Sequence, residues 1–270
     1  MTGWVIVRRS VAEHRRWMMG WSIGMVALSA FTIAFWPALR DKSTTLNSMV
    51  NGLPASVRAL VGMGGGIDPF SPLGYLLSKV FAFMLPLLML IAAIGLAGAV
   101  AGDEERGLLE TTYTLPIARR RVLVERWLAL MVLTTVLAAA AFVSVAITAR
   151  LVDLGVGIAS IGWATASCLA LTWAVAAIAF ALGAGTGRRG SAISVAAVVG
   201  VVSYLITSLA EAGIGFFRLL RPVSLFTHYD VAHVLVSGAP SWRLGVLLGV
   251  AAVGVSLAVW GIDRRDLRAA

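Results

Sequence analysis

A chain of 270 residues in which 59% are hydrophobic and only 13% are charged lies outside the composition of soluble domains, where about a quarter of the residues are charged. This composition excludes an ordinary soluble enzyme and indicates a polytopic membrane protein. The formal net charge of +9 does not indicate a nucleic-acid partner, because the basic residues fall in short clusters between apolar runs. The single cysteine, Cys168, allows neither an intrachain disulfide nor a cysteine metal cluster.

A basic segment, WVIVRRSVAEHRRW at 4–17, precedes the first apolar run. Helical spacing separates its apolar residues from its arginines: Trp4, Val7 and Val11 against Arg8, Arg9, Arg15 and Arg16. This pattern predicts a helix that lies in the inner membrane interface with its arginines toward lipid phosphates. A positively charged leader that only sets orientation accounts for the same residues, and both interpretations stay open.

Six apolar runs meet or nearly meet the roughly 20 residues that a helix needs to cross a bilayer core. They cover residues 17–37, 75–101, 122–151, 158–185, 191–210 and 244–262. The first has a basic leader like that of a signal peptide, but its hydrophobicity continues through Trp36, so we expect a retained span. Pro86 removes a backbone hydrogen bond and predicts a kink in the second run. The predicted fold is all-α, with six transmembrane helices in a single domain over 1–270.

The basic residues predict how these spans are oriented. With the N-terminus in the cytoplasm, fourteen of the 22 basic residues lie on the cytoplasmic side, seven lie on the opposite side, and Lys79 lies near the outer end of a span. This excess follows the positive-inside rule. We therefore expect a multi-pass protein of the cell membrane with both termini in the cytoplasm.

The sequence carries no signature of an ATPase site of its own. A P-loop needs a lysine directly after a glycine, so that the lysine reaches the β and γ phosphates, and neither Lys42 nor Lys79 follows a glycine. The GMGGG sequence at 62–66 is interpreted as a flexible outer turn and not as a nucleotide loop. We therefore expect no enzyme active site and no cofactor in this chain.

Ion pathways and metal sites are not indicated either. No acid, histidine or arginine lies near the centre of a run, and the long side chain of Lys79 can snorkel to the outer interface. The same interpretation applies to the ionisable residues at outer ends: Arg150, Asp153 and Glu211. Candidate metal ligands occur in THYDVAH: His228, Asp230 and His233. Their histidines lack the i, i+4 spacing that puts two imidazoles on one helical face, so we expect no metal.

The longest concentration of charge, GDEERGLLETTYTLPIARRR at 102–121, follows the second run and is predicted to be cytoplasmic. Helical spacing gives it two faces: Leu108, Leu109, Thr112 and Leu115 against Arg106, Glu110 and Tyr113. Its first turn is acidic, which suits the helix dipole, and Pro116 restarts helix where a missing N–H costs little. The stretch therefore predicts a short amphipathic helix, followed by the basic start of the third span.

The sequence GDEERGLLETTYTLPIARRRVLVERW resembles the segment after the second span of ABC type-2 exporter permeases. The matching segment of that family is a coupling helix that docks on a separate ATP-binding subunit. The resemblance implies that docking falls to Glu104, Glu105, Arg106, Gly107, Leu108, Glu110 and Thr111, with Pro116 and Arg119 fixing the exit. Ala118 departs from the family pattern, in which serine is commoner at this position.

The resemblance extends over nearly the whole chain. The stretches at 52–90, 183–190 and 261–267 are similar to the outer loop and second span, the inner turn and the cytoplasmic tail of the antibiotic or multidrug transport permeases. In the family, the region matching 211–230 forms short re-entrant helices near the outer leaflet. The resemblance implies export of a hydrophobic or amphiphilic antibiotic, drug or lipid. It also implies three partners: an ATP-binding cassette subunit that binds ATP and Mg²⁺, a second permease subunit in a homodimer or heterodimer, and membrane lipid.

Two other functions are alternatives to a permease. A secondary transporter driven by an ion gradient needs intramembrane carboxylates or broken helices in repeated halves, and neither is evident. A non-transporting anchor or immunity protein would use the charged stretch at 102–121 only to bind a partner. The resemblance favours the permease over both.

Overall fold

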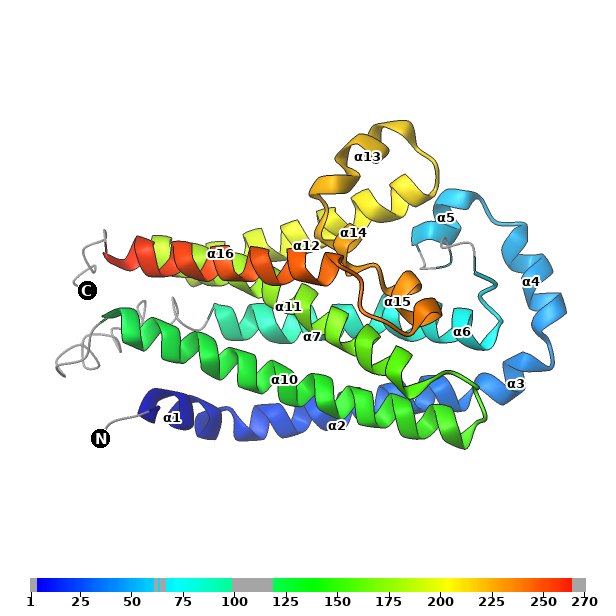
Figure 1. The fold of residues 1–270 in the computed structure, drawn as a ribbon, viewed down its shortest axis with the longest axis horizontal. Coiled ribbons are helices and arrows are strands. Elements are labelled where there is room, and N and C mark those ends of the chain that lie inside the picture. The colour runs from blue at the N-terminus through cyan, green and yellow to red at the C-terminus, as the bar shows by residue number, and fades with distance from the viewer. Residues whose placement is uncertain (1–3, 61–62, 64–66, 99–118, 264–270) are drawn as a thin grey trace.

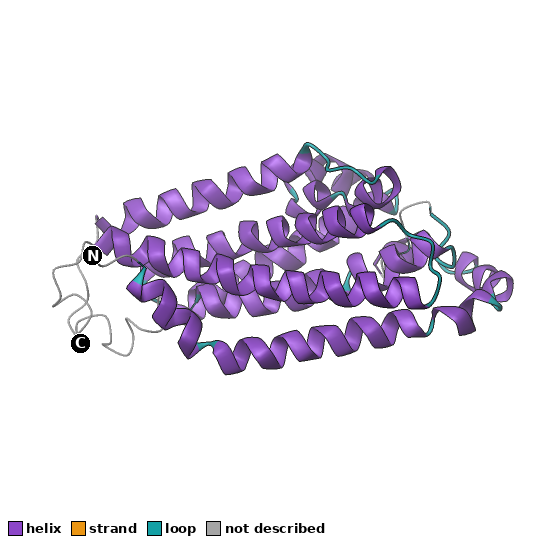
Figure 2. Ribbon diagram, turned by 60° about the horizontal axis from the view of Figure 1, so that its bottom comes forward, coloured by secondary structure: helices purple, strands orange, loops and turns teal. Residues whose placement is uncertain are grey.

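The computed structural model describes residues 4–60, 63, 67–98 and 119–263. Among these residues, every regular element is a helix, and the long helices run side by side as one bundle (Figures 1 and 2). Six helical stretches are long and apolar enough to cross a membrane: Arg15–Arg40, Pro72–Ala97, Arg120–Leu151, Ile158–Thr186, Arg189–Glu211 and Arg243–Ile262. They coincide with the six predicted runs, so the all-α, six-span prediction is confirmed.

The first span consists of two helices that follow a separate N-terminal helix. Helix α1 (Val5–Glu13) is separated by His14 from α2 (Arg15–Ala34), and α3 (Trp36–Arg40) follows α2. The predicted run stops at Pro37, but helix continues to Arg40 because Pro37 occupies the first turn of α3, where its missing N–H has no intrahelical partner to lose. In α1, Val7 and Val11 are half-buried while Arg8 and Arg9 are exposed, as the spacing predicts, but Trp4 is 58% exposed.

The second span is broken before the proline that was expected to kink it. It comprises α6 (Pro72–Tyr75), the π-helix η1 (Leu76–Phe81) and α7 (Met84–Ala97). Phe83, with φ −136° and ψ −57°, interrupts the helix. The proline ring of residue 86 cannot accommodate the carbonyl of residue 82, four positions earlier, so the interruption lies on the N-terminal side of Pro86. Pro86 itself lies in the first turn of α7.

The centre of the bundle is α11 (Ile158–Thr186), which packs against α7, α10 (Arg119–Leu151), α12 (Arg189–Glu211) and α16 (Arg243–Asp263). Its buried face is built from small residues, among them Ala174, Ala176 and Ala177, none of which is exposed. A Cβ added at Gly254 of α16 would lie 2.8 Å from the Cβ of Ala177. Small residues thus bring these two backbones together, as in many membrane helix pairs.

Buried hydroxyl groups join neighbouring spans in the bundle. Ser29 of α2 donates a 2.9 Å hydrogen bond to Ser144 of α10, and Ser144 donates to the carbonyl of Val26 at 3.0 Å. The indole N–H of Trp173 donates to the Thr134 hydroxyl at 2.9 Å. Each of these bonds satisfies a polar group that would be costly to leave unpaired in an apolar interior.

Short helices form most of the end of the bundle that lies opposite α1. After the first span come α4 (Ser43–Asn51) and α5 (Ala55–Leu60). After the fifth come α13 (Gly215–Leu220), the 3₁₀-helix η2 (Arg221–Val223), α14 (Leu225–Tyr229) and α15 (Val231–Ser237). The region 211–230 is thus apolar but interrupted, as predicted, and it crosses back toward the start of α16 (Figure 1).

Candidate functional site

The described helices around the predicted coupling segment meet at one end of the bundle. Helix α7 ends at Ala97 and α10 begins at Arg119, on the same end as α1 (Figure 1). Arg119 is the first residue of α10. The other predicted docking residues lie outside the described residues and stay a prediction: Glu104, Glu105, Arg106, Gly107, Leu108, Glu110, Thr111 and Pro116.

Glu125 attaches α1 to the beginning of α10. Its side chain is only 6% exposed, and its Oε2 atom accepts a 3.0 Å hydrogen bond from the backbone N–H of Ile6 in the first turn of α1. Its Oε1 atom accepts a 2.9 Å hydrogen bond from Arg121 Nε, one helical turn earlier. The carboxylate therefore fills the role of an N-cap for α1, where the free N–H groups and the helix dipole favour negative charge.

The sequence analysis did not single out Glu125. The available signal was the i, i+4 spacing of Arg121 and Glu125 on a predicted helix, which favours an ion pair. The contact with Ile6 joins positions 119 residues apart and has no local signature. Glu125 lies six residues after the start of α10 and within ten residues of Pro116, so it belongs to the same region of the chain as the predicted coupling segment.

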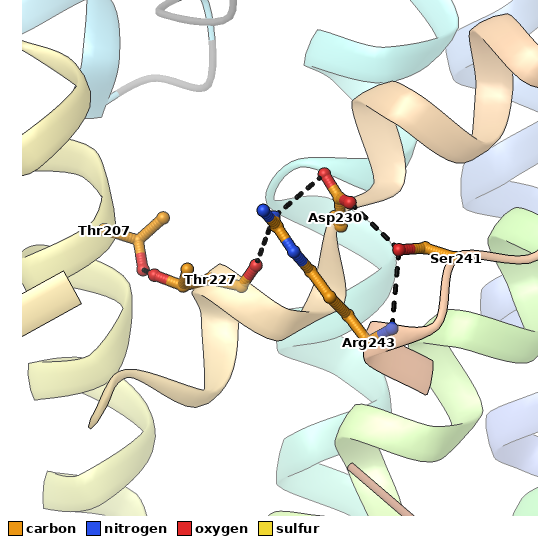
Figure 3. A network of polar contacts seen from close by, with 5 residues as sticks. All are labelled: Thr207, Thr227, Asp230, Ser241 and Arg243. Carbon is orange, nitrogen blue, oxygen red and sulfur yellow. Dashed lines mark hydrogen bonds and ion pairs between the residues drawn. The ribbon is translucent and has the colours of Figure 1, made fainter. Parts of the chain in front are cut away.

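At the other end of the bundle, Asp230 and Arg243 form the centre of a polar network (Figure 3). Arg243, the first residue of α16, extends an Nη1 atom that lies 3.3 Å from Asp230 Oδ1 and donates to the Thr227 carbonyl at 3.2 Å. Ser241 donates a 3.1 Å hydrogen bond to the other carboxylate oxygen of Asp230. Because Asp230 lies between α14 and α15, the network attaches this pair of short helices to the start of the sixth span.

A chain of hydroxyls continues the network onto α12. Thr207 Oγ1 lies 2.7 Å from Ser224 Oγ and 3.0 Å from Thr227 Oγ1, and Ser224 donates to the Ser203 carbonyl at 2.6 Å. The Tyr204 hydroxyl donates to the Leu60 carbonyl at 2.6 Å and thereby holds α5 on the same helix. The fifth span, the short helices and the sixth span are thus joined by hydrogen bonds.

Two residues of the THYDVAH sequence, Thr227 and Asp230, belong to this network. Asp230 pairs with Arg243, and the His228 Nε2 atom lies 3.0 Å from the Pro222 carbonyl. Within the described part of the chain, no three His, Cys, Asp or Glu residues are close enough to hold a metal ion. Asp230 adopts a left-handed backbone conformation, with φ 38°, which aspartate tolerates better than most residues.

An apolar groove lies between α2 and α10, with a volume of about 540 Å³. Its lining is almost entirely aliphatic: Val26, Ala30, Val136, Ala139, Ala140, Val143, Ser144, Ile147 and Thr148. Ser144 makes two of the hydrogen bonds described above, so its hydroxyl is already satisfied. The groove therefore offers a ligand apolar surface and almost no free polar group.

Comparison with protein families agrees with this architecture. Residues 4–267 match the family described as ABC-2 family transporter protein. The chain belongs to that family. The match includes all six spans, the helix α1 and the segment between α7 and α10. No curated protein matches the chain.

Membership in the ABC-2 family makes the chain a membrane permease component of an ABC transporter. The family implies partnership with a subunit that binds ATP, because the permease is a transport component and not itself the ATPase. The six apolar helices agree with a multi-pass membrane protein. The resemblance stated from the residues at 102–127 is thereby confirmed at the level of the family.

Proposed function

We propose that this ABC-2 permease is the membrane-spanning subunit of an ATP-driven exporter that moves a hydrophobic or amphiphilic substrate, such as an antibiotic, a drug or a lipid, out of the cell. A separate ATP-binding subunit supplies the energy and holds ATP and Mg²⁺. That subunit docks on the predicted coupling segment at 102–121. The observation that carries the proposal is the family match over 4–267 in a chain with six spans.

The position of α1 supports a route from the docking segment into the bundle. The segment joins the end of α7 to the start of α10, and Glu125 connects the first turns of α10 to α1. Helix α1 leads directly into α2, which packs along α10. A displacement applied at the start of α10 therefore reaches the first span through the Glu125–Ile6 hydrogen bond and the connection from α1 to α2, as well as through the packing of α2 along α10.

The apolar groove between α2 and α10 supports the class of cargo. Its aliphatic lining favours a ligand without buried charge. The groove opens on the faces of two spans that expose large apolar side chains, among them Ile23, Phe31 and Val143. These faces suit contact with lipid and with a second permease subunit. We propose that two such permeases, identical or different, enclose the path of the cargo in the cell membrane, with both termini of each chain in the cytoplasm.

Reconstitution in liposomes with the ATP-binding subunit tests the function. We expect the permease to stimulate ATP hydrolysis and to move an amphiphilic dye against its gradient, and we expect both activities to persist when the proton gradient is collapsed. Loss of transport on collapse would indicate an ion-coupled carrier. ATP hydrolysis that the permease does not change, with no transport, would indicate an anchor or immunity protein.

Variants of the predicted docking residues test the coupling role. Glu105→Gln and Gly107→Leu should abolish transport and the stimulation of ATP hydrolysis while leaving membrane insertion unchanged. Glu13→Gln is the matched control, because Glu13 is an exposed acid on α1 that pairs only with Arg9, at 2.8 Å, in the described structure. Transport at the wild-type rate by both docking variants would show that the coupling assignment is wrong.

A further inference from the structure

A small cavity lies beside the Asp230 network, where α12 meets the short helices. Its volume is about 110 Å³, which leaves room for a small polar group of a few heavy atoms. Residues of five parts of the fold line it: α5, η1, α12, the segment from η2 to α15, and the start of α16. This site is distinct from the apolar groove between α2 and α10, with which it shares no residue.

Four charged residues line the cavity, two of each sign. Asp230 and Arg243 neutralise one another through their ion pair at 3.3 Å. Glu211 and Arg221 are both exposed, and neither has a hydrogen-bond or ion-pair partner within 4.0 Å among the described residues. The cavity thus presents a carboxylate and a guanidinium that interact electrostatically with one another but form no ion pair within 4.0 Å, with no net formal charge.

Aromatic side chains also line the cavity. Tyr204 of α12 and Phe226 of α14 both line the cavity, with ring centroids 5.3 Å apart in an edge-to-face arrangement. The Tyr204 hydroxyl is occupied by the Leu60 carbonyl, so the ring offers its apolar surface. Aromatic rings beside a carboxylate are a favourable environment for an organic ammonium group.

The surface next to the cavity is apolar and projects from the bundle. Helix α13 has no buried residue, and Figure 1 shows it projecting from the bundle beside the end of α12. Leu219 and Val223 are 81% and 80% exposed, and Phe216 is 66% exposed. Arg221 lies between Leu219 and Val223 in the chain, so an apolar tail on the ligand would find hydrophobic surface beside the Arg221 guanidinium.

We propose that this cavity binds the zwitterionic head group of an amphiphile. The ammonium of the ligand lies against Glu211 and the aromatic rings, its phosphate or carboxylate lies against Arg221, and its apolar tail lies along α13. Complementary charges at two positions favour a zwitterion over a ligand that carries only one charge, because only the zwitterion gives both side chains a partner. The identification of this ligand as cargo rests on the proposed function, whereas its binding does not.

Calorimetric titration of the full chain in a nonionic detergent tests the binding. The probe is a phosphatidylethanolamine with six-carbon chains, and the comparison probes are phosphatidylglycerol with the same chains and hexylammonium. We expect the zwitterion to bind at least tenfold more tightly than either singly charged probe. Glycerophosphoethanolamine, which has no chains, should bind at least tenfold more weakly than the acylated probe, and equal binding would contradict the role of α13.

Glu211→Gln and Arg221→Gln should each weaken binding of the zwitterion by at least tenfold. The matched controls are Asp153→Asn and Arg150→Gln, which remove one charge of each sign from exposed residues outside the cavity and away from α13, and should leave binding unchanged. If a single variant does not fold, the double exchange Glu211→Arg with Arg221→Glu keeps both charges and should retain binding. Equal affinity for all probes, or wild-type affinity in both neutral variants, would overturn the proposal.

Transport measurements separate this site from the proposed function. Binding of the probe by a reconstituted complex that exports nothing would contradict the exporter and leave the site in place, as a site for a membrane lipid. Export of other amphiphiles by a protein that does not bind the zwitterion would contradict the site and leave the exporter in place.

Discussion

At each end of the bundle, a carboxylate joins a short helical element to a long helix. The two ends differ in the number of side chains that take part. At the α1 end, Glu125 accepts hydrogen bonds from both the Ile6 N–H and Arg121, and α1 also packs against α10. At the opposite end, Asp230 accepts a hydrogen bond from Ser241 and forms an ion pair with Arg243, and a chain of hydroxyls extends the network to α12. One carboxylate thus makes the long-range hydrogen bond to α1, whereas several side chains share the polar contacts at the other end. We therefore expect α1 to open more readily than the α14 and α15 pair, which is held by several polar contacts.

The largest effect on overall stability is expected from Arg243→Ala. The change removes the partner of Asp230 and the donor to the Thr227 carbonyl, and should lower the free energy of unfolding in detergent by about 2 kcal/mol, since the pair is largely but not fully buried. A double-mutant cycle with Asp230→Asn should give a coupling energy of about 1 kcal/mol. Arg218→Ala, on the exposed helix α13, is the control and should have little effect. Additive single changes would show that the ion pair does not couple the two positions.

Glu125→Ala should act locally at the other end. Loss of a hydrogen bond to a charged acceptor, worth about 1.5 to 3 kcal/mol, should raise the exchange rate of the Ile6 amide by at least tenfold while the unfolding midpoint changes little. Glu13→Ala, on the exposed face of α1, should leave the Ile6 amide unchanged. A fall in overall stability as large as that of Arg243→Ala would contradict the difference between the two ends.

The smallest effect is expected from Thr207→Val, which tests whether several side chains share the polar contacts at the α14 and α15 end. Ser224 keeps its bond to the Ser203 carbonyl when the Thr207 hydroxyl is removed, so the cost should be about 1 kcal/mol or less, measured by chemical unfolding. Thr135→Val is the matched control, because the exposed Thr135 hydroxyl bonds only within its own helix, to the Met131 carbonyl. A cost above that of Arg243→Ala would show that the hydroxyl chain, and not the ion pair, holds this end together.

The six spans were predictable from the sequence because a helix that crosses a bilayer needs a long apolar run, which leaves a strong local pattern. The proline at 86 correctly marked the second span as irregular, but the position of the break at Phe83 depends on packing around the π-helix. The short helices α4 and α5 were not predicted, since segments of nine and six residues carry little periodicity.

The polar contacts were less predictable than the spans. Asp230 and Arg243 are thirteen residues apart, and the pairing depends on how α14 and α15 return to the start of α16. Glu211 was interpreted as a residue that snorkels at the end of a span, and only the fold shows that it shares a cavity with Arg221. The residues predicted to dock an ATP-binding subunit, from Glu104 to Thr111, lie outside the described residues, so that assignment still depends on the family resemblance.

The contact between Gly254 and Ala177 limits which parts of the permease move during a transport cycle. Helices α11 and α16 meet so closely there that a side chain at position 254 would clash with Ala177. Sliding one helix by one residue along its axis would therefore force its side chains into the backbone of the other. We therefore expect these two helices to stay fixed relative to one another. Rearrangement during transport is therefore expected in the helices that lack such interlocking, chiefly α2, with the broken second span as a natural point of bending.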